Sequence, residues 1–152
     1  MVKRKRAVKD VAALLADLEV QATFVRRTAI IDLVERGARE TSGRLESLLS
    51  DKEASIRACA AWALGELGAP TAERPLALCL KDMDVDVRRA AAQSLANMSL
   101  PISEVALQSA SVDSDRWVAE WARRGLARLQ NGALRKRPRA IRKNPAEGSG
   151  GA

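Results

Sequence analysis

Arginine residues that could bind phosphate groups recur every 31 residues in this sequence, at Arg26, Arg57 and Arg88. A row of cations at constant spacing can neutralise successive phosphates of a nucleic acid and release their counterions. The spacing is too long to place these arginines on one helix. A phosphate-binding row therefore requires a chain built from repeated units.

Aspartate residues recur in the same register, at Asp51, Asp82 and Asp113. An Asp before a run of helix-forming residues can accept the free backbone N–H groups of the first turn, so we expect these three residues to be helix N-caps. Asp82, Asp84 and Asp86 also resemble the start of a calcium loop, but the Gly and the terminal Glu of that motif are missing. We therefore predict no calcium site.

The sequence predicts a protein that is not an enzyme and has no catalytic residue, cofactor or metal site. It contains no His, which removes the usual general base near neutral pH and the commonest metal ligand. Cys59 and Cys79 are both expected to be small core residues with reduced thiols, because two cysteines without a signal peptide indicate a cytoplasmic protein.

The positive charge is concentrated at the two ends of the chain. The formal net charge is +7, yet residues 10–132 carry 15 Lys and Arg against 18 Asp and Glu. Such basic arms can attract phosphates or an acidic partner over a long range. The candidate contacts are Lys3, Arg4, Lys5, Arg6, Arg135, Lys136, Arg137, Arg139, Arg142 and Lys143.

No part of the sequence has the pattern of a membrane span. The longest apolar runs are far shorter than the ~20 residues that cross a bilayer. The basic start MVKRKR is followed by Lys9, Asp10, Asp17 and Glu19, so it lacks the apolar region of a secretory signal. We expect a cytoplasmic protein.

Apolar residues repeat with the same period and predict pairs of helices, which we call helix A and helix B. Ile56, Val87 and Val118 are equivalent, and apolar positions at i, i+3, i+4 and i+7 continue each helix A. A turn is expected at Pro70, Pro101 and Gly132, before each helix B. The chain is predicted to open with a lone helix B near 8–18 and to stop with a helix A near 114–130, because Pro138 and the surrounding basic residues cannot form another helix B.

These residues resemble the short HEAT-like repeats seen in phycobilisome-lyase-like proteins. The signature D-x-x-x-x-V/I-R-x-x-A-A-x-x-L-x-x-L/M is complete after Asp51 and Asp82, whereas the third unit has Ala119 for Arg and Arg123 for the second Ala. The resemblance covers about residues 8–130. It implies an all-α, right-handed α-solenoid of antiparallel helix pairs, with about seven to eight helices. It also implies that the recurring Arg bonds to acidic or backbone groups of adjacent turns, and we favour this structural role over phosphate binding.

Three regions are therefore predicted: a basic N-terminal arm (1–7), a HEAT-like solenoid (8–132) and a basic tail (133–152). Trp117 and Trp121, four residues apart on the last helix A, are expected to cover the core where the next helix B is missing. Alternatively, they form an apolar patch for a partner or for self-association through the C-terminal end. Exposed positions of the B helices are the other candidate contacts: Arg44, Glu46, Glu73, Arg74, Lys81, Glu104 and Gln108.

A non-catalytic scaffold or adaptor that binds another protein is the leading functional hypothesis, because a stacked repeat offers a long surface. The alternative is a nucleic-acid-binding module that grips phosphates with its basic arms. The resemblance to lyase-like proteins suggests a third role, an accessory subunit of such an enzyme. No aromatic residue lies within either arm, which argues against stacking on single-stranded nucleic acid.

Overall fold

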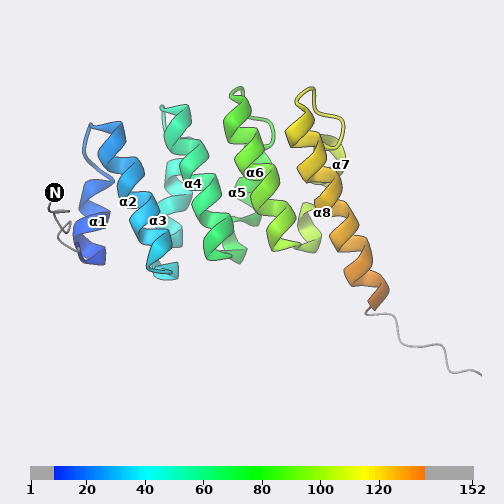
Figure 1. Ribbon diagram of the computed structural model, residues 1–152, viewed down its shortest axis with the longest axis horizontal. Helices are drawn as coiled ribbons and strands as arrows, with labels where there is room; N and C mark the ends of the chain where they lie inside the picture. The colour runs from blue at the N-terminus through cyan, green and yellow to red at the C-terminus, as the bar shows by residue number, and fades with distance from the viewer. Residues whose placement is uncertain (1–8, 136–152) are drawn as a thin grey trace, which may run out of the picture.

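The computed structural model describes residues 9–135, except for the side chains of 102 and 133–135, and this part of the chain is entirely helical between its turns (Figure 1). Short 3-10 turns precede or extend the B helices: η1 (Arg39–Thr41), η2 (Leu48–Ser50), η3 (Pro70–Ala72) and η4 (Pro101–Ser103). The α-helices are α1 (Val11–Asp17), α2 (Thr23–Glu35), α3 (Ser42–Ser47), α4 (Ala54–Leu67), α5 (Glu73–Cys79), α6 (Val85–Met98), α7 (Glu104–Ala110) and α8 (Arg116–Arg135).

The helices form two layers, which confirms the expected α-solenoid. The longer helices α2, α4, α6 and α8 are the A helices and stand side by side in one row (Figure 1). The shorter helices α1, α3, α5 and α7 are the B helices and pack behind that row. The loops that lead into the A helices lie along one edge of the stack, which is the upper edge in Figure 1.

Each helix B packs mainly against the helix A that follows it. The contacts join α1 to α2, α3 to α4, α5 to α6 and α7 to α8, and α7 touches the preceding α6 far less. The described chain is therefore four complete B–A pairs. The order of the helices is the expected one, namely a first helix B, three A/B units and a last helix A. The pairing of each helix B with the helix A that follows it was not expected, because the sequence period does not reveal which neighbour a helix packs against.

The core consists of small and aliphatic side chains at equivalent repeat positions. Ile56 and Val87 are fully buried, and so are the Ala residues that follow four positions later, Ala60 and Ala91. Leu64 and Leu95 are likewise 0% exposed. These positions are the ones that the periodicity predicts, because a helix buries one stripe at a spacing of three and four residues.

Neighbouring A helices approach closely through their smallest residues. Ser94 of α6 donates a hydrogen bond from Oγ to the backbone carbonyl of Ala61 at 2.9 Å. A Cβ atom added to Gly65 of α4 would lie only 2.8 Å from the Cα of Ser94. Gly125 of α8 is similarly placed against Ala96 of α6. The separation of the A helices therefore depends on the lack of a side chain at these glycines.

Two details at the helix ends differ from expectation. The N-cap of α6 is Asp84, whose carboxylate accepts from the N–H groups of Asp86 and Val87, whereas Asp82 lies two residues earlier and accepts from the N–H of Asp84. Asp115 accepts in the same way from the first turn of α8. In addition, α8 continues past Gly132 to Arg135, because Gly132 does not block the helix as Pro70 and Pro101 do. The helical region thus extends three residues beyond the expected boundary at 132.

The recurring Arg and Asp residues join each repeat to the next. Arg57 donates from Nε and Nη2 to the two carboxylate oxygens of Asp82, both at 2.8 Å, and from Nη1 to the carbonyl of Asp51 at 2.9 Å. Arg88 bonds in the same way to Asp113 and to the carbonyl of Asp82. Arg26 pairs with Asp51. The structural role of these arginines is therefore confirmed, and we call the series the Asp–Arg relay.

The relay also sets the ionisation of its carboxylates. Bonding to Arg57 holds the pKa of Asp82 below its ordinary value, although partial burial opposes this effect. Arg26 lowers the pKa of Asp51 for the same reason. Both groups are consequently negative in the folded protein at neutral pH, as the pairing requires.

We expect Arg57→Ala to lower the free energy of unfolding by about 2–3 kcal/mol, because the Asp82 carboxylate then loses its partner in a site that is mostly shielded from water. The matched control is Arg44→Ala, which removes an exposed ion pair with Glu19 and should cost less than ~1 kcal/mol. Urea denaturation followed by circular dichroism measures both. Equal effects of the two substitutions would show that the relay does not stabilise the stack.

We expect Gly65→Ala to destabilise the protein by about 1–3 kcal/mol, since the added methyl group meets the backbone of Ser94. Gly43→Ala is the control: Gly43 lies in α3 with nothing within 4 Å of an added Cβ. This second substitution should stabilise by about 0.5–1 kcal/mol through helix propensity. Thermal unfolding of both variants tests the prediction, and a harmless Gly65→Ala would contradict the close approach of α4 and α6.

Candidate functional site

Several predicted contact residues on the B helices instead join one repeat to the next. Arg44 pairs with Glu19, and Glu46 accepts a hydrogen bond from the Thr71 hydroxyl at 2.6 Å. Glu73 is only 8% exposed, and its carboxylate accepts from both the backbone N–H and the hydroxyl of Ser103. The prediction that Glu73 is a surface contact is therefore wrong, because this carboxylate binds the start of the next helix B.

The other predicted B-helix residues are exposed. Arg74 and Lys81 lie at the surface, as do Glu104 and Gln108, which approach each other at 3.5 Å. The sequence reasoning did not single out two exposed apolar side chains on the same helices, Leu78 (71% exposed) and Val105 (76%). The sequence gives no distinct signal for either residue, because both lie among other apolar residues, such as Leu76 and Leu107.

All four aromatic residues lie on the A helices, and none belongs to the buried core. Phe24 on α2 and Trp117 on α8 occupy the same repeat position and are 73% and 48% exposed. Trp62 on α4 and Trp121 on α8 are partly buried and touch the core from outside. We call the solvent-facing side of α2, α4, α6 and α8 the A-helix face, and it carries every aromatic side chain of the protein.

Arginine side chains accompany the aromatic rings at the C-terminal end of the A-helix face. The guanidinium carbon of Arg116 lies 5.1 Å from the ring centre of Trp117, and that of Arg124 lies 5.1 Å from the ring centre of Trp121. Both distances are typical of cation–π contacts. Trp121 is equivalent to Cys59, so it belongs to the A-helix face. It was expected to cover the place of a missing helix B, but α8 already has a helix B as its partner, namely α7.

A groove of about 480 Å³ lies on the A-helix face between α2 and α4. Arg27 and Ile31 of α2 line one side, and Ala58, Cys59 and Trp62 of α4 line the other. Cys59 is thus partly exposed and not the core residue that we expected, whereas Cys79 is buried as expected. Both are free thiols. Burial raises the pKa of the Cys59 thiol, an effect that nearby Arg27 partly opposes.

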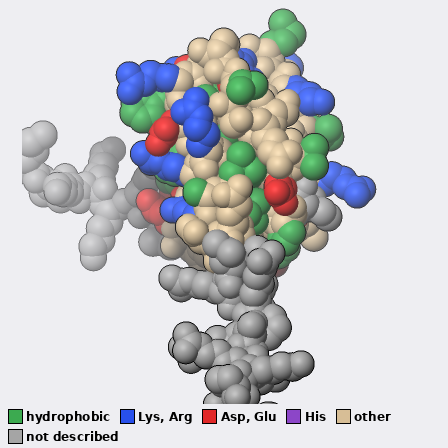
Figure 2. Space-filling model, turned by 90° about the vertical axis from the view of Figure 1, so that its right-hand side faces the viewer, with side chains coloured by type: hydrophobic (Ala, Val, Ile, Leu, Met, Phe, Trp, Pro, Cys, Tyr) green, Lys and Arg blue, Asp and Glu red, His purple; other side chains and the backbone are tan. Residues whose placement is uncertain are grey.

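The C-terminal end of the stack is polar. Figure 2 views this end and shows Lys and Arg side chains spread over it, with hydrophobic side chains in separate small areas. Arg123 occupies the repeat position of Ala61 and Ala92, where a following helix would otherwise pack. Self-association through this end stays a prediction, and the exposed Arg123 argues against a close helix contact there.

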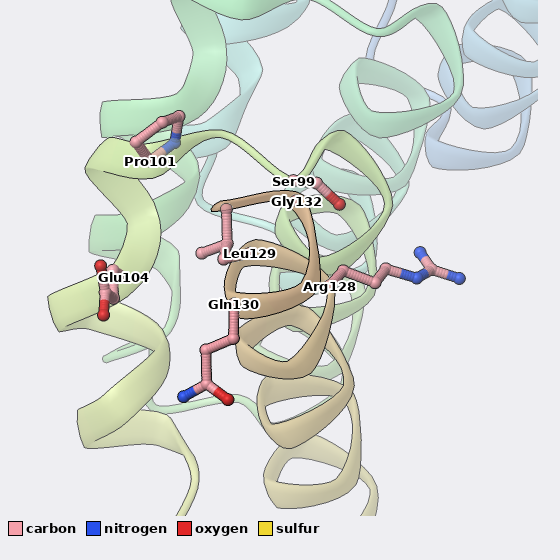
Figure 3. Close-up of a pocket in the computed structure, with 7 residues that line it drawn as sticks. All are labelled: Ser99, Pro101, Glu104, Arg128, Leu129, Gln130 and Gly132. Atoms are coloured by element: carbon pink, nitrogen blue, oxygen red, sulfur yellow. The ribbon is translucent and has the colours of Figure 1, made fainter. Parts of the chain in front are cut away.

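A second hollow, of about 350 Å³, lies between α7 and the last turns of α8 (Figure 3). Leu129 and Gln130 of α8 and Glu104 of α7 line it, while Arg128 points away from it (Figure 3). Arg128 donates to the Ala96 carbonyl and the Asn97 side chain, both at 3.0 Å. Arg128, the one cation among the described side chains that line this hollow, is thus already bonded to α6, so we do not assign the hollow a ligand.

Most of the predicted phosphate contacts lie outside the described residues, namely Lys3, Arg4, Lys5, Arg6, Lys136, Arg137, Arg139, Arg142 and Lys143. Arg135 is the last residue of α8. Within residues 9–135, no group of three or more Cys, Asp or Glu side chains is placed to hold a metal ion. In the same range, no helix is both long enough and apolar enough to cross a bilayer.

The repeat pattern matches a family model described as HEAT repeats over residues 11–96, which is more than half of the chain. The protein belongs to the HEAT repeat family. The match runs from α1 into α6 and includes the complete signature after Asp51 and the signature after Asp82 up to Leu95, without its last position, Met98. A comparison with curated protein sequences found no match.

Several solved structures share this HEAT repeat architecture. Human deoxyhypusine hydroxylase, in complex with glycerol, is 27% identical with a TM-score of 0.68, and the match covers 80% of this chain and 44% of that one. An engineered protein is 21% identical (TM-score 0.62; 80% and 63% covered). The complex of CpcE and CpcF of phycocyanin lyase from Nostoc sp. PCC7120 gives 19% identity (TM-score 0.62; 88% and 70%). The chain thus spans less than half of the hydroxylase.

We expect the two thiols to differ in reactivity, because Cys59 opens onto the groove whereas burial raises the pKa of Cys79 to about 11. In the folded protein at pH 8, Ellman's reagent should modify Cys59 at least about tenfold faster than Cys79. The variants Cys79→Ala and Cys59→Ala isolate each thiol, and both place the Ala found at the equivalent position, Ala110 or Ala90. Similar rates in the two variants would contradict an open groove beside Cys59.

Proposed function

We propose that this HEAT repeat protein is a non-catalytic scaffold that binds another protein through its A-helix face. The observation that carries the proposal is the placement of all four aromatic residues on this face and outside the core. Aromatic and Arg side chains contribute most strongly to protein–protein binding, and aromatic side chains do so because they bury a large area with few rotatable bonds. Arg116 and Arg124 stand directly over two of the rings.

The alternative surface, formed by the B helices, is less suited to this role. Some of its charged residues already bond within the stack, as Arg44 does with Glu19 and Glu46 does with Thr71. A partner that used them would have to break these contacts. Exposed apolar residues gain by leaving water when a partner covers them. On the A-helix face these residues include aromatic rings, whereas on the B helices they are the aliphatic Leu78 and Val105.

Two pairs of substitutions compare the faces directly. Phe24→Ala with Trp117→Ala truncates two exposed apolar residues of the A-helix face, and Leu78→Ala with Val105→Ala does the same on the B helices. Each variant and the unaltered chain serve as bait in lysate from the source organism, and quantitative mass spectrometry measures the recovered proteins. Circular dichroism checks that each bait is folded.

We expect the A-helix variant to recover about tenfold less of its specific partner, or even less, than the unaltered chain does. The reason is that truncating aromatic contacts at an interface typically costs about 2 kcal/mol or more of binding free energy. The B-helix variant should retain that partner. If the B-helix variant alone loses it, the binding surface is on the opposite layer. If neither variant loses it, the solenoid faces are not the docking surface.

A further inference from the structure

In the groove between α2 and α4, the A-helix face is hollowed next to an aromatic ring, Trp62. Its α4 wall carries two small side chains, Ala58 and Cys59, beside Trp62. At the equivalent positions on α8 the side chains are larger, Glu120 and Trp121. Large side chains therefore occupy these two repeat positions on α8, whereas the small side chains on α4 leave space for the groove beside α2.

The groove combines an apolar floor with a single cation that is available for binding. Ile31 and Trp62 supply apolar surface, and Ile31 remains 38% exposed. Arg27 is exposed at the rim and forms no ion pair with any residue of the described chain from 9 to 135. The neighbouring acid at the other rim, Asp86, pairs with Arg89 at 3.1 Å. An incoming carboxylate is therefore the complementary group for Arg27.

The volume of the groove also limits its occupant. About 480 Å³ falls within the range of ~300–1,000 Å³ that is common for sites of small ligands and side chains. It is too small for a folded domain to enter, but it accommodates one bulky side chain with its flanking backbone. The open side of the groove allows the rest of a peptide segment to continue across the A-helix face.

We propose that this groove binds a partner segment in which a bulky apolar side chain stands next to Asp or Glu. The apolar side chain packs on Trp62 and Ile31, and the carboxylate pairs with Arg27. This inference rests on the proposed scaffold function and names the chemistry of the partner. It makes Arg27 and Trp62 residues that determine specificity, neither of which the sequence pattern alone had singled out as a contact.

The probes are three capped pentapeptides with a central Phe between two identical residues: Ac-Ala-Glu-Phe-Glu-Ala-NH2 and its forms with Gln or Lys in place of Glu. Binding is followed on the full chain by NMR of the indole N–H groups. The protein has three Trp residues, and Trp62→Phe identifies the signal of Trp62. The Glu peptide should shift this signal at millimolar concentration and bind about two- to fivefold more tightly than the Gln peptide, since one exposed charge pair is worth up to ~1 kcal/mol.

Arg27→Gln provides the decisive control. It should weaken the Glu peptide to the level of the Gln peptide and leave the Gln peptide unchanged, because only the carboxylate contact is removed. Arg27 is exposed, so the variant is expected to fold normally. Arg36→Gln, another exposed arginine of the same layer just beyond the end of α2, should have no effect on either peptide.

Four results would overturn the inference. The first is equal binding of the Glu and Gln peptides, and the second is tighter binding of the Lys peptide than of the Glu peptide. The third is no shift of the Trp62 signal at 10 mM peptide. The fourth is a Trp62 signal that shifts with protein concentration when no peptide is present. The last result would indicate that a second copy of the chain occupies the groove. If the variant with Phe24→Ala and Trp117→Ala loses its partner but the peptides do not bind the groove, only this inference is refuted. The proposed scaffold function then stays in place.

Discussion

The Asp–Arg relay is the interaction on which the regularity of this protein depends. Each guanidinium holds a backbone carbonyl of the loop before its own helix and the carboxylate of the next loop, as Arg57 does with Asp51 and Asp82. Because the contact joins residues 25 positions apart, it fixes the step from one repeat to the next. The relay stops where its arginine is replaced by Ala119, and α8 is the last A helix of the described chain.

The position of the aromatic residues follows from the narrow spacing between A helices. Gly65 faces Ser94 with no room for a methyl group, so an indole or phenyl ring cannot lie between neighbouring helices. The core is consequently filled by Ala, Leu, Ile and Val. Rings such as Trp62 and Trp117 are accommodated only on the outside of the A row, where they remain available to a partner.

The helices and the core could be predicted from the sequence, because the 31-residue repeat and the spacing of apolar residues within each helix can be read directly from it. The equivalence of Ile56 and Val87 is an example. The N-cap could not be predicted, since Asp82 and Asp84 are both able to cap α6. In the structure Asp84 caps this helix, and Asp82 pairs with Arg57 of the preceding repeat. The burial of Glu73 likewise depends on a hydrogen bond to the next repeat. The groove escaped notice because it arises from small residues on one helix facing another, which no spacing within a single helix reveals.

The pairing of each helix B with the helix A that follows it also defines the module from which the protein is built. A natural unit starts at a B helix and ends at the next A helix, so the turns such as Pro70 lie between modules and not inside them. Evolution or design can thus lengthen the molecule by inserting a complete B–A pair at one of these turns, which exposes no unpaired apolar face. The number of modules then becomes adjustable independently of the surface residues that each one displays.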